Sequence, residues 1–309
     1  MEREGGFMDL SLRGLVPKPV RRLIGRLPAP AKTVIHAPRL YVRRLWQWAF
    51  VAIETKPVGK GSAGRWLASI AASPLTSAGG LNGWKRPMLS WNATLRAKGI
   101  GVFFVRADSD DLYHILPSRE RHVLEIIRRS LSKGDVFVDA GANNGVFTVL
   151  AAHLVGESGR VVAIEMIPST ASCLRRNVAL NDLDNVEVVE RALADTAGRI
   201  VSAIVPTRLF GSASIAHRDG AGERIDVTTT TLDEATAGIE TINLLKIDLE
   251  GAERLAMAGA AATIDKCRGI IFEAKEDDIS DILIQRGFTI DVLDRNNRIA
   301  VRDRRDLSA

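Results

Sequence analysis

The fold of this chain is decided by residues 134–147, which are Gly-Asp-Val-Phe-Val-Asp-Ala-Gly-Ala-Asn-Asn-Gly-Val-Phe. The β-branched and aromatic run from Val136 to Val138 predicts a short buried strand that ends at Asp139. Small residues then form a tight turn from Gly141 to Gly145, and apolar residues at helical spacing predict a helix over 146–155. A strand, a glycine-rich turn and a helix together present backbone N–H groups and a helix N-terminus to a bound ligand.

Two common glycine loops do not fit this turn. A phosphate-binding P-loop ends in Gly-Lys followed by Ser or Thr, and no lysine follows here. A dinucleotide-binding fingerprint requires Gly-x-Gly-x-x-Gly, and Asn143 stands at its second glycine position. An acidic residue before small residues suits a ligand with a cationic centre, such as the sulfonium and α-amino groups of S-adenosylmethionine. An ordinary strand-to-helix turn without a ligand is the alternative.

A second acidic residue follows at an informative distance. The apolar run from Val161 to Ile164 predicts another strand, and Glu165 ends it 20 residues after Gly145. A doubly wound fold places its ribose-binding carboxylate at about this distance. One carboxylate can accept hydrogen bonds from both ribose hydroxyls, because it has two acceptor oxygens and no donor. The alternative is that Glu165 is only a surface charge at the end of a strand.

The composition indicates a globular protein with an uneven charge. Of its 309 residues, 46% are hydrophobic and 26% are charged, as in ordinary folded domains. Residues 1–106 carry 18 Lys and Arg against 4 Asp and Glu, whereas residues 107–309 carry 24 against 33. Two cysteines without metal-site spacing, Cys173 and Cys267, and an N-terminus without a signal-peptide pattern lead us to expect a cytoplasmic protein.

The basic N-terminal part is expected to be a separate, partly flexible region over 1–99, followed by the main domain over 100–309. Residues 39–53 combine arginines and tryptophans at helical spacing and predict an amphipathic helix. This helix either lies peripherally on an anionic membrane or docks its aromatic face on the main domain. The uncharged stretch 66–84 contains a proline, three glycines and three serines, so no membrane span is expected. No nucleic-acid-binding module is recognisable, and no nucleic-acid partner is expected.

From residue 134 onward, strand and helix patterns alternate. With the stretch before it, strands are expected at 100–106, 113–117, 136–138, 161–164, 186–189, 200–205, 225–231, 242–247, 269–272, 288–293 and 299–302. Besides the helix over 146–155, helices are expected over 118–131, with Ser118 as its cap, from Pro168, and over 277–285. The pattern predicts an α/β fold, a mostly parallel doubly wound sheet with a C-terminal antiparallel hairpin.

Five stretches occur in the order typical of one known family. They are Phe-Val-Asp-Ala-Gly-Ala-Asn-Asn-Gly-Val-Phe-Thr at 137–148, Ala-Ile-Glu-Met-Ile-Pro-Ser at 163–169, Leu-Arg-Arg-Asn-Val-Ala-Leu-Asn at 174–181, Thr-Leu-Asp at 231–233 and Leu-Lys-Ile-Asp-Leu-Glu-Gly-Ala-Glu at 245–253. Through them, residues 134–302 resemble the FkbM-type family of S-adenosylmethionine-dependent methyltransferases. One departure is Met166-Ile167, where the family often has a shorter Glu-Pro link.

This resemblance implies a Rossmann-like class I methyltransferase fold with S-adenosylmethionine as cofactor. It also implies O-methylation of a hydroxyl on a sugar, glycan or small natural-product acceptor. By family position, the methionine end of the cofactor would be held by Asp139, Gly141, Asn143 and Gly145. Glu165 would hold the ribose, and residues around Arg191 and Ala192 would face the adenine.

Methyl transfer to oxygen depends mainly on alignment and is helped by a base that takes the hydroxyl proton. Asp248 is the first candidate base, because it ends the strand at 242–247, where the crevice of an open α/β sheet lies. His217, in the Gly- and Ser-rich stretch 206–224, is the second, and an exposed histidine without a role is its alternative. For Glu253, helix capping is at least as good an interpretation as catalysis.

The ends of two neighbouring strands offer an alternative metal site. Asp248 and Glu273 end these strands, and their carboxylates could hold Mg²⁺. The Asp-Asn pair that some methyltransferases add is missing, since Ala274 follows Glu273, so no metal is expected. Three other functions stay open: a cofactor-fold protein that binds without catalysing, methyl transfer to nitrogen, and an NAD-dependent dehydrogenase.

Overall fold

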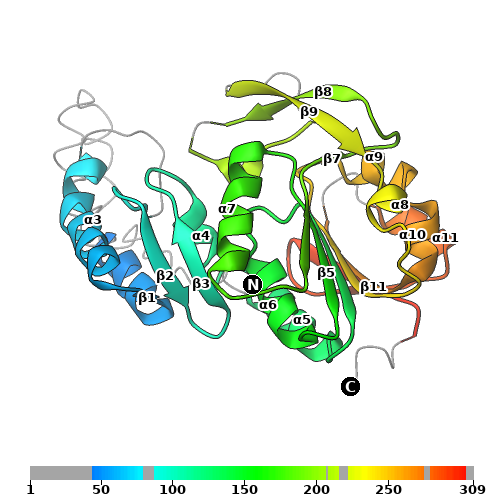
Figure 1. The fold of residues 1–309 in the computed structure, drawn as a ribbon, viewed down its shortest axis with the longest axis horizontal. Coiled ribbons are helices and arrows are strands. Elements are labelled where there is room, and N and C mark those ends of the chain that lie inside the picture. Colours follow the sequence, from blue (N-terminus) through cyan, green and yellow to red (C-terminus); the bar gives the residue numbers. More distant parts are fainter. Residues whose placement is uncertain (1–43, 79–86, 207, 216–221, 275–278, 304–309) are drawn as a thin grey trace, which may run out of the picture. The chain divides into compact units, whose positions relative to one another are not determined.

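The computed structural model describes residues 44–78, 87–206, 208–215, 222–274 and 279–303 (Figure 1). The chain divides into two units. One comprises Met1–Lys98 and Val105–Arg119, and the other comprises Gly99–Phe104 and Glu120–Ala309. The second candidate base, His217, and the start of the helix expected over 39–53 lie outside the described residues.

In the first unit, a helix through residues 44–54 leads into β1 (Thr55–Pro57), and α3 (Lys60–Ala78) follows. β1 pairs antiparallel with β2 (Ala93–Ala97). The two helices meet through an aromatic pair, since the rings of Trp48 and Trp66 lie edge to face with centroids 6.3 Å apart. Trp48 is only 2% exposed, so the pair belongs to the core of this unit.

Two predictions for residues 113–131 were wrong. A short helix, α4 (Asp111–His114), stands where a strand was expected at 113–117. The reason is local, because the Asp111 carboxylate accepts a hydrogen bond from the Arg106 backbone N–H at 2.9 Å and so closes a turn. Ser118 does not cap the next helix, since its hydroxyl donates instead to Glu54 at 2.9 Å.

The second unit contains a seven-stranded sheet in the order β12-β13-β11-β10-β4-β5-β6 (Figure 1). Its strands are β4 (Val136–Ala140), β5 (Arg160–Ile164), β6 (Val186–Val189), β10 (Ile242–Ile247), β11 (Cys267–Glu273), β12 (Thr289–Val292) and β13 (Asn297–Val301). The strands from β11 to β6 are parallel, whereas β13 and β12 add an antiparallel hairpin at one edge. The predicted doubly wound sheet with a C-terminal hairpin is confirmed.

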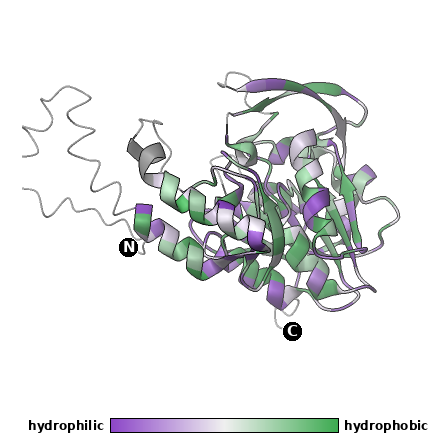
Figure 2. Cartoon of the chain, turned by 60° about the vertical axis from the view of Figure 1, so that its left-hand side comes forward, coloured by the Kyte–Doolittle hydropathy of each residue, from purple (hydrophilic) through white to green (hydrophobic). Residues whose placement is uncertain are grey.

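Helices lie on both faces of this sheet. They are α5 (Arg121–Ser130), α6 (Val146–Val155), α7 (Pro168–Ala179), α8 (Leu232–Ala235), α9 (Glu253–Ala258), α10 (Ala261–Lys266) and α11 (Ser280–Gln285). Successive strand residues point to opposite faces. Val138 and Ala140 join the core with Ala256 and Ile264 of α9 and α10, whereas Asp139 meets Thr148 of α6. Figure 2 shows the central strands coloured mostly as hydrophobic, as burial on both faces requires.

The segment between β6 and β10 carries a small second sheet. Its strands β7 (Ala192–Leu193), β8 (Ile200–Val205) and β9 (Glu223–Thr230) lie in the order β7-β9-β8. β8 and β9 pair antiparallel, and the 3-10 helix η2 (Phe210–Ser212) follows β8. The inserted strands predicted at 200–205 and 225–231 are therefore present.

Two asparagines of the block at 174–181 explain how α7 binds strand β3 (Gly101–Val105). The Asn177 side-chain oxygen accepts from the Phe104 N–H at 2.7 Å, and that of Asn181 accepts from the Val102 N–H at 2.8 Å. The Asn181 amide also donates back to the Val102 carbonyl at 2.7 Å. These asparagines therefore satisfy backbone groups that a strand would otherwise leave open. Among the residues described, no helix is both long and apolar enough to cross a bilayer.

Candidate functional site

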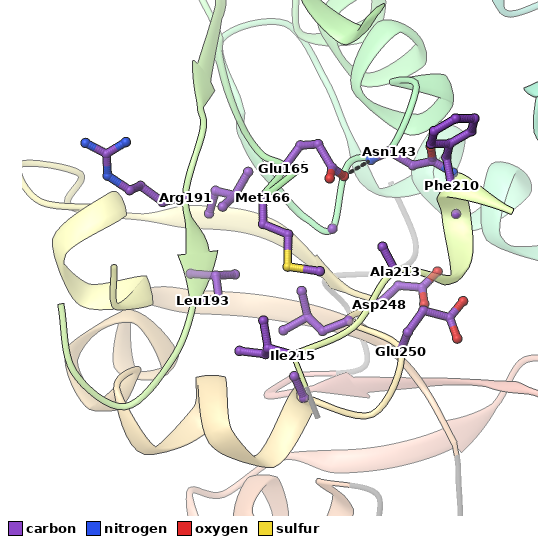
Figure 3. Close-up of a pocket in the computed structure, with 15 residues that line it drawn as sticks. Asn143, Glu165, Met166, Arg191, Leu193, Phe210, Ala213, Ile215, Asp248 and Glu250 are labelled. Carbon is purple, nitrogen blue, oxygen red and sulfur yellow. Dashed lines mark hydrogen bonds between the residues drawn. The ribbon is translucent and has the colours of Figure 1, made fainter. Parts of the chain in front are cut away.

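A cavity lies at the carboxyl ends of β4, β5 and β10, where an open α/β sheet binds its ligands (Figure 3). Its wall includes Gly141, Asn143, Glu165, Met166, Phe210 and Asp248. The inserted segment contributes Phe210, so the small sheet and η2 close one side of the cavity. Sequence reasoning missed Phe210, because nothing local to it indicated which loop returns to the sheet edge.

Glu165 is fixed on the cavity wall by two backbone amides. The Asn143 N–H donates to its Oε2 at 2.9 Å (Figure 3), and the Ile167 N–H donates to its Oε1 at 2.9 Å. The residue is 8% exposed. A carboxylate oxygen can accept more than one hydrogen bond, so a group of this kind can also bind ligand hydroxyls. The turn after β4 is thus hydrogen-bonded to the residue that follows β5.

The glycines of the turn are required by the protein's own packing. Gly141 has φ +84°, and a Cβ there would lie 1.9 Å from the backbone oxygen of Asp248. Gly145 has φ +89°, and its Cβ would lie 2.4 Å from Leu174 Cδ1. A side chain at either position would therefore both strain the backbone and displace a neighbour. The sequence analysis assigned these small residues to close ligand approach, and the structure adds the approach of the Asp248 main chain.

Asp139 does not lie on the cavity wall. Its side chain is fully buried and faces α6, where the Thr148 hydroxyl donates to Oδ2 at 2.7 Å. The other oxygen, Oδ1, has no hydrogen-bond partner among the described residues. Burial raises the pKa of Asp139, and the positive charge of Lys246 opposes this shift. The resemblance implied that Asp139 holds the methionine end of the cofactor, but its side chain lies behind the turn and not on the cavity wall.

Lys246 joins Asp139 to the cavity. It is 3% exposed and lies directly opposite Asp139 in the parallel pairing of β10 with β4. Its Nζ lies 3.2 Å from Asp248 Oδ2 and 4.8 Å from the centre of the Phe147 ring. Burial alone would lower the pKa of Lys246, but Asp248 and Asp139 outweigh it and raise the pKa above its ordinary value. One buried ammonium therefore serves two carboxylates.

The candidate catalytic residues are placed differently from one another. Asp248 lines the cavity with its side chain 28% exposed, so an acceptor can reach it. Glu253 has a structural role, since its Oε1 accepts from the Leu249 N–H at 2.9 Å and the Gly251 N–H at 3.2 Å. These bonds close the turn before α9 and favour the capping interpretation. The placement of His217 lies outside the described residues.

Ala192 does not line the cavity, contrary to its expected place beside the adenine. It is 1% exposed and packs in a small core with Ile167 and Val227. Its neighbours Arg191 and Leu193 line the cavity instead. The alternation of side chains along β7 explains the difference, because adjacent residues face opposite sides of a strand.

Three carboxylates among the described residues lie close enough to share a metal ion. Oxygens of Asp248, Glu253 and Glu273 are all within 4.8 Å of one another. Glu253 is bound by two backbone amides, and Asp248 is bound by the Lys246 ammonium. A cation beside Asp248 weakens the attraction of this group for a second cation. The expectation that no metal is bound stays a prediction.

Comparisons with known proteins place this geometry in context. A model of the methyltransferase FkbM domain matches residues 139–294. The methyltransferase sdnD of Sordaria araneosa is 29% identical over 161 residues, which cover 42% of this chain and 62% of that protein. The 31-O-demethyl-FK506 methyltransferase FkbM of Streptomyces tacrolimicus is 29% identical over 196 residues, covering 52% of this chain and 75% of that protein. The match thus spans less than two thirds of sdnD.

One of the similar solved structures carries the same family name. It is the methyltransferase FkbM from Methylobacillus flagellatus KT, with 17% sequence identity and a TM-score of 0.37. The alignment covers 56% of this chain and 44% of that one.

Proposed function

Because this chain belongs to the FkbM-type family of S-adenosylmethionine-dependent methyltransferases, we propose that it methylates a hydroxyl of a sugar, glycan or small natural product. The family predicted from the sequence is confirmed by the match over 139–294. With the family come the Rossmann-like class I fold and S-adenosylmethionine as the cofactor. When bound, this cofactor supplies a positively charged sulfonium whose methyl group is transferred.

One observation carries the proposal: Glu165 and Asp248 border the same cavity on either side of the glycine turn (Figure 3). Glu165, already oriented by two amides, would accept hydrogen bonds from the ribose hydroxyls. Asp248 follows β10, which lies on the other side of β4 from β5, and it would face the reacting end of the cofactor. The arrangement gives one carboxylate for binding and a second for chemistry.

The turn also fits the ammonium group at the methionine end. Two buried oxygens at the β4–α6 junction, Asp139 Oδ1 and Asn143 Oδ1, have no hydrogen-bond donor among the described residues. A buried acceptor without a donor costs free energy, so a ligand that brings an N–H group to Asn143, which lines the cavity, is favoured. We infer that this end of the cavity binds the amino group, with Asp139 acting through its charge from behind the turn.

The cavity as it stands is too small for a whole adenosyl group. It holds about 50 Å³, whereas ligand pockets typically hold about 300–1,000 Å³. Figure 3 shows the Met166 side chain reaching into the space between Leu193 and Asp248. Met is unbranched and adapts its rotamers readily. We therefore infer that cofactor binding displaces Met166 and the adjoining η2 segment.

For the transfer step, the chain mainly provides alignment. An in-line displacement needs the acceptor oxygen held close to the methyl group, and the leaving group is already good. Asp248 would accept the proton that the hydroxyl loses. The Lys246 ammonium at 3.2 Å orients the Asp248 carboxylate. Oxygen as the methylated atom is supported by the name of the Streptomyces tacrolimicus relative, a 31-O-demethyl-FK506 methyltransferase.

The test separates binding from chemistry. Isothermal titration of the full chain with S-adenosylmethionine should give binding, and Asp139→Ala should abolish it. Asp248→Asn should bind normally but lose methyl transfer in a labelled-methyl screen of polysaccharide and small-molecule extracts. Absence of binding would reject the cofactor and the enzyme together, and binding of NAD instead would indicate a dehydrogenase. A product methylated at nitrogen would refute oxygen as the acceptor atom. Full turnover by Asp248→Asn would refute Asp248 as the base.

A further inference from the structure

The helix through residues 44–54 exposes an apolar side. Its well-exposed residues are Leu45, Trp46, Ala49, Ala52 and Ile53, and none of them carries a charge or a polar side chain. Leu45, Trp46 and Ile53 are 43%, 55% and 66% exposed. The opposite side of the helix packs inward through Trp48 and Val51, which are at most 2% exposed. A helix of a globular protein normally turns its polar side to water. The exposed apolar side of helix 44–54 is therefore expected to bind a partner.

The chain around this helix is basic and nearly free of acidic residues. No Asp or Glu occurs between Glu54 and Asp108. The carboxylate of Glu54 is itself engaged, because the Ser118 hydroxyl donates to it at 2.9 Å. Exposed cations in the described part of this stretch are Lys56, Lys60, Arg65, Arg96 and Lys98. The stretch between Glu54 and Asp108 therefore carries a net positive charge.

Two of these cations are placed where they repel each other. Lys56 and Arg96 lie directly opposite in the antiparallel pairing of β1 with β2, and both are exposed. Like charges at such a position destabilise a sheet. An anionic partner would offset this repulsion. Ile53 and Val58, which lie near Lys56 in the sequence, are 66% and 38% exposed.

We propose that the first unit docks peripherally on an anionic lipid surface, with the exposed side of helix 44–54 in the interface and the cations of 56–98 on the headgroups. Apolar side chains with Trp at the boundary and Lys or Arg beside them are the composition of interfacial helices. A nucleic acid fits less well, because Leu45, Ala49 and Ile53 offer it neither charge nor a stacking surface.

Vesicle flotation with the full chain tests this proposal. The probes are vesicles of phosphatidylcholine alone and of phosphatidylcholine with phosphatidylglycerol. The protein should float with the anionic vesicles only, and less so as salt rises. Ile53→Glu should reduce the partition by about tenfold or more, because it places a charge where an apolar side chain would be buried in the lipid. Ile200→Glu is the matched control, since Ile200 is 73% exposed in the second unit and should change little.

Further measurements test the role of the cations and the folding of the variant. Lys56→Glu with Arg96→Glu should lower binding to anionic vesicles and weaken its salt dependence. Binding of S-adenosylmethionine by Ile53→Glu should stay unchanged, which shows that its second unit is folded, and its far-UV circular dichroism should match that of the wild type. The proposal is overturned if the wild type does not float, if Ile53→Glu floats like Ile200→Glu, or if single-stranded RNA displaces the vesicles. It is also overturned if Ile53→Glu only changes the oligomeric state.

Discussion

The Nζ of Lys246 lies 3.2 Å from Asp248 Oδ2, with the lysine side chain 4% exposed and the aspartate side chain 28% exposed. Lys246 also faces Asp139 across the pairing of β4 with β10. The ammonium therefore connects a carboxylate on the cavity wall with another buried behind the glycine turn. A change at Lys246 should affect both ends of the proposed cofactor site.

Lys246→Met should destabilise the protein by about 3 kcal/mol, because it leaves buried carboxylates without their cation. The measurement is the free energy of unfolding in urea. Lys133→Met, at an exposed position, is the control and should change stability little. Adding Asp139→Asn to Lys246→Met should restore part of the loss, since the uncompensated buried charge disappears. Equal stability of the two lysine variants would show that the pairing contributes nothing.

Glu165→Gln should weaken S-adenosylmethionine binding by at least about tenfold, as expected for the loss of hydrogen bonds to a charged acceptor. The new side-chain amide has an NH₂ group in place of one acceptor oxygen. It therefore cannot accept both of the hydrogen bonds that the Asn143 and Ile167 N–H groups donate to Glu165. Titration calorimetry gives the dissociation constant. Glu187→Gln, at an exposed position of β6, should bind like the wild type. An unchanged constant for Glu165→Gln would remove this residue from the cofactor site.

Gly141→Ala should destabilise the chain more than Gly238→Ala does. Both glycines have positive φ, +84° and +77°, so both substitutions carry a similar backbone cost of about 1–2 kcal/mol. Only at Gly141 would the new Cβ meet a neighbour, the Asp248 backbone oxygen at 1.9 Å, because nothing lies within 4 Å at Gly238. The difference between the two unfolding free energies measures this contact. Gly141→Ala should also lower turnover, since Asp248 must move, and equal stabilities would refute the contact.

Asp233→Ala should cost about 1–2 kcal/mol at neutral pH, as the loss of a helix cap does. Asp233 Oδ1 accepts from the Thr263 N–H at 2.6 Å and from its hydroxyl at 2.7 Å, while Oδ2 accepts from the Ala262 N–H at 3.1 Å, at the start of α10.

The same site gives a pH dependence. Partial burial alone would raise the pKa of Asp233, but the hydrogen bonds from Thr263 and Ala262 outweigh it and lower the pKa below its ordinary 3.8. The stabilisation is therefore fully present above about pH 4 and is lost as the pH falls through the lowered value. Urea unfolding at pH 7 and near pH 2 should show a large and then a vanishing difference between wild type and Asp233→Ala. A pH-independent difference, or an equal loss in the exposed Asp184→Ala control, would contradict this account.

Much of the fold follows from local signals in the sequence. Apolar runs such as Val161–Ile164, and breakers such as Pro168, predicted the strands and helices of the second unit, because burial on a sheet requires that pattern wherever the sheet forms. The strand predicted at 113–117 and the helix cap predicted at Ser118 were wrong, because side-chain contacts decide the local structure there. There the side chains of Asp111 and Ser118 bind Arg106 and Glu54, partners that no periodicity reveals.

The sequence by itself determined the family, the order of the elements and the strand ends from which Glu165 and Asp248 reach a common cavity. Only the tertiary structure decided that Asp139 lies behind the turn, that Ala192 packs inward, and that Lys246 joins two carboxylates. The physical reason is that a strand's position is written in its own hydrophobic pattern. Which face a strand-end residue takes, and which charge it meets, depends on the register with neighbouring strands far away in the sequence.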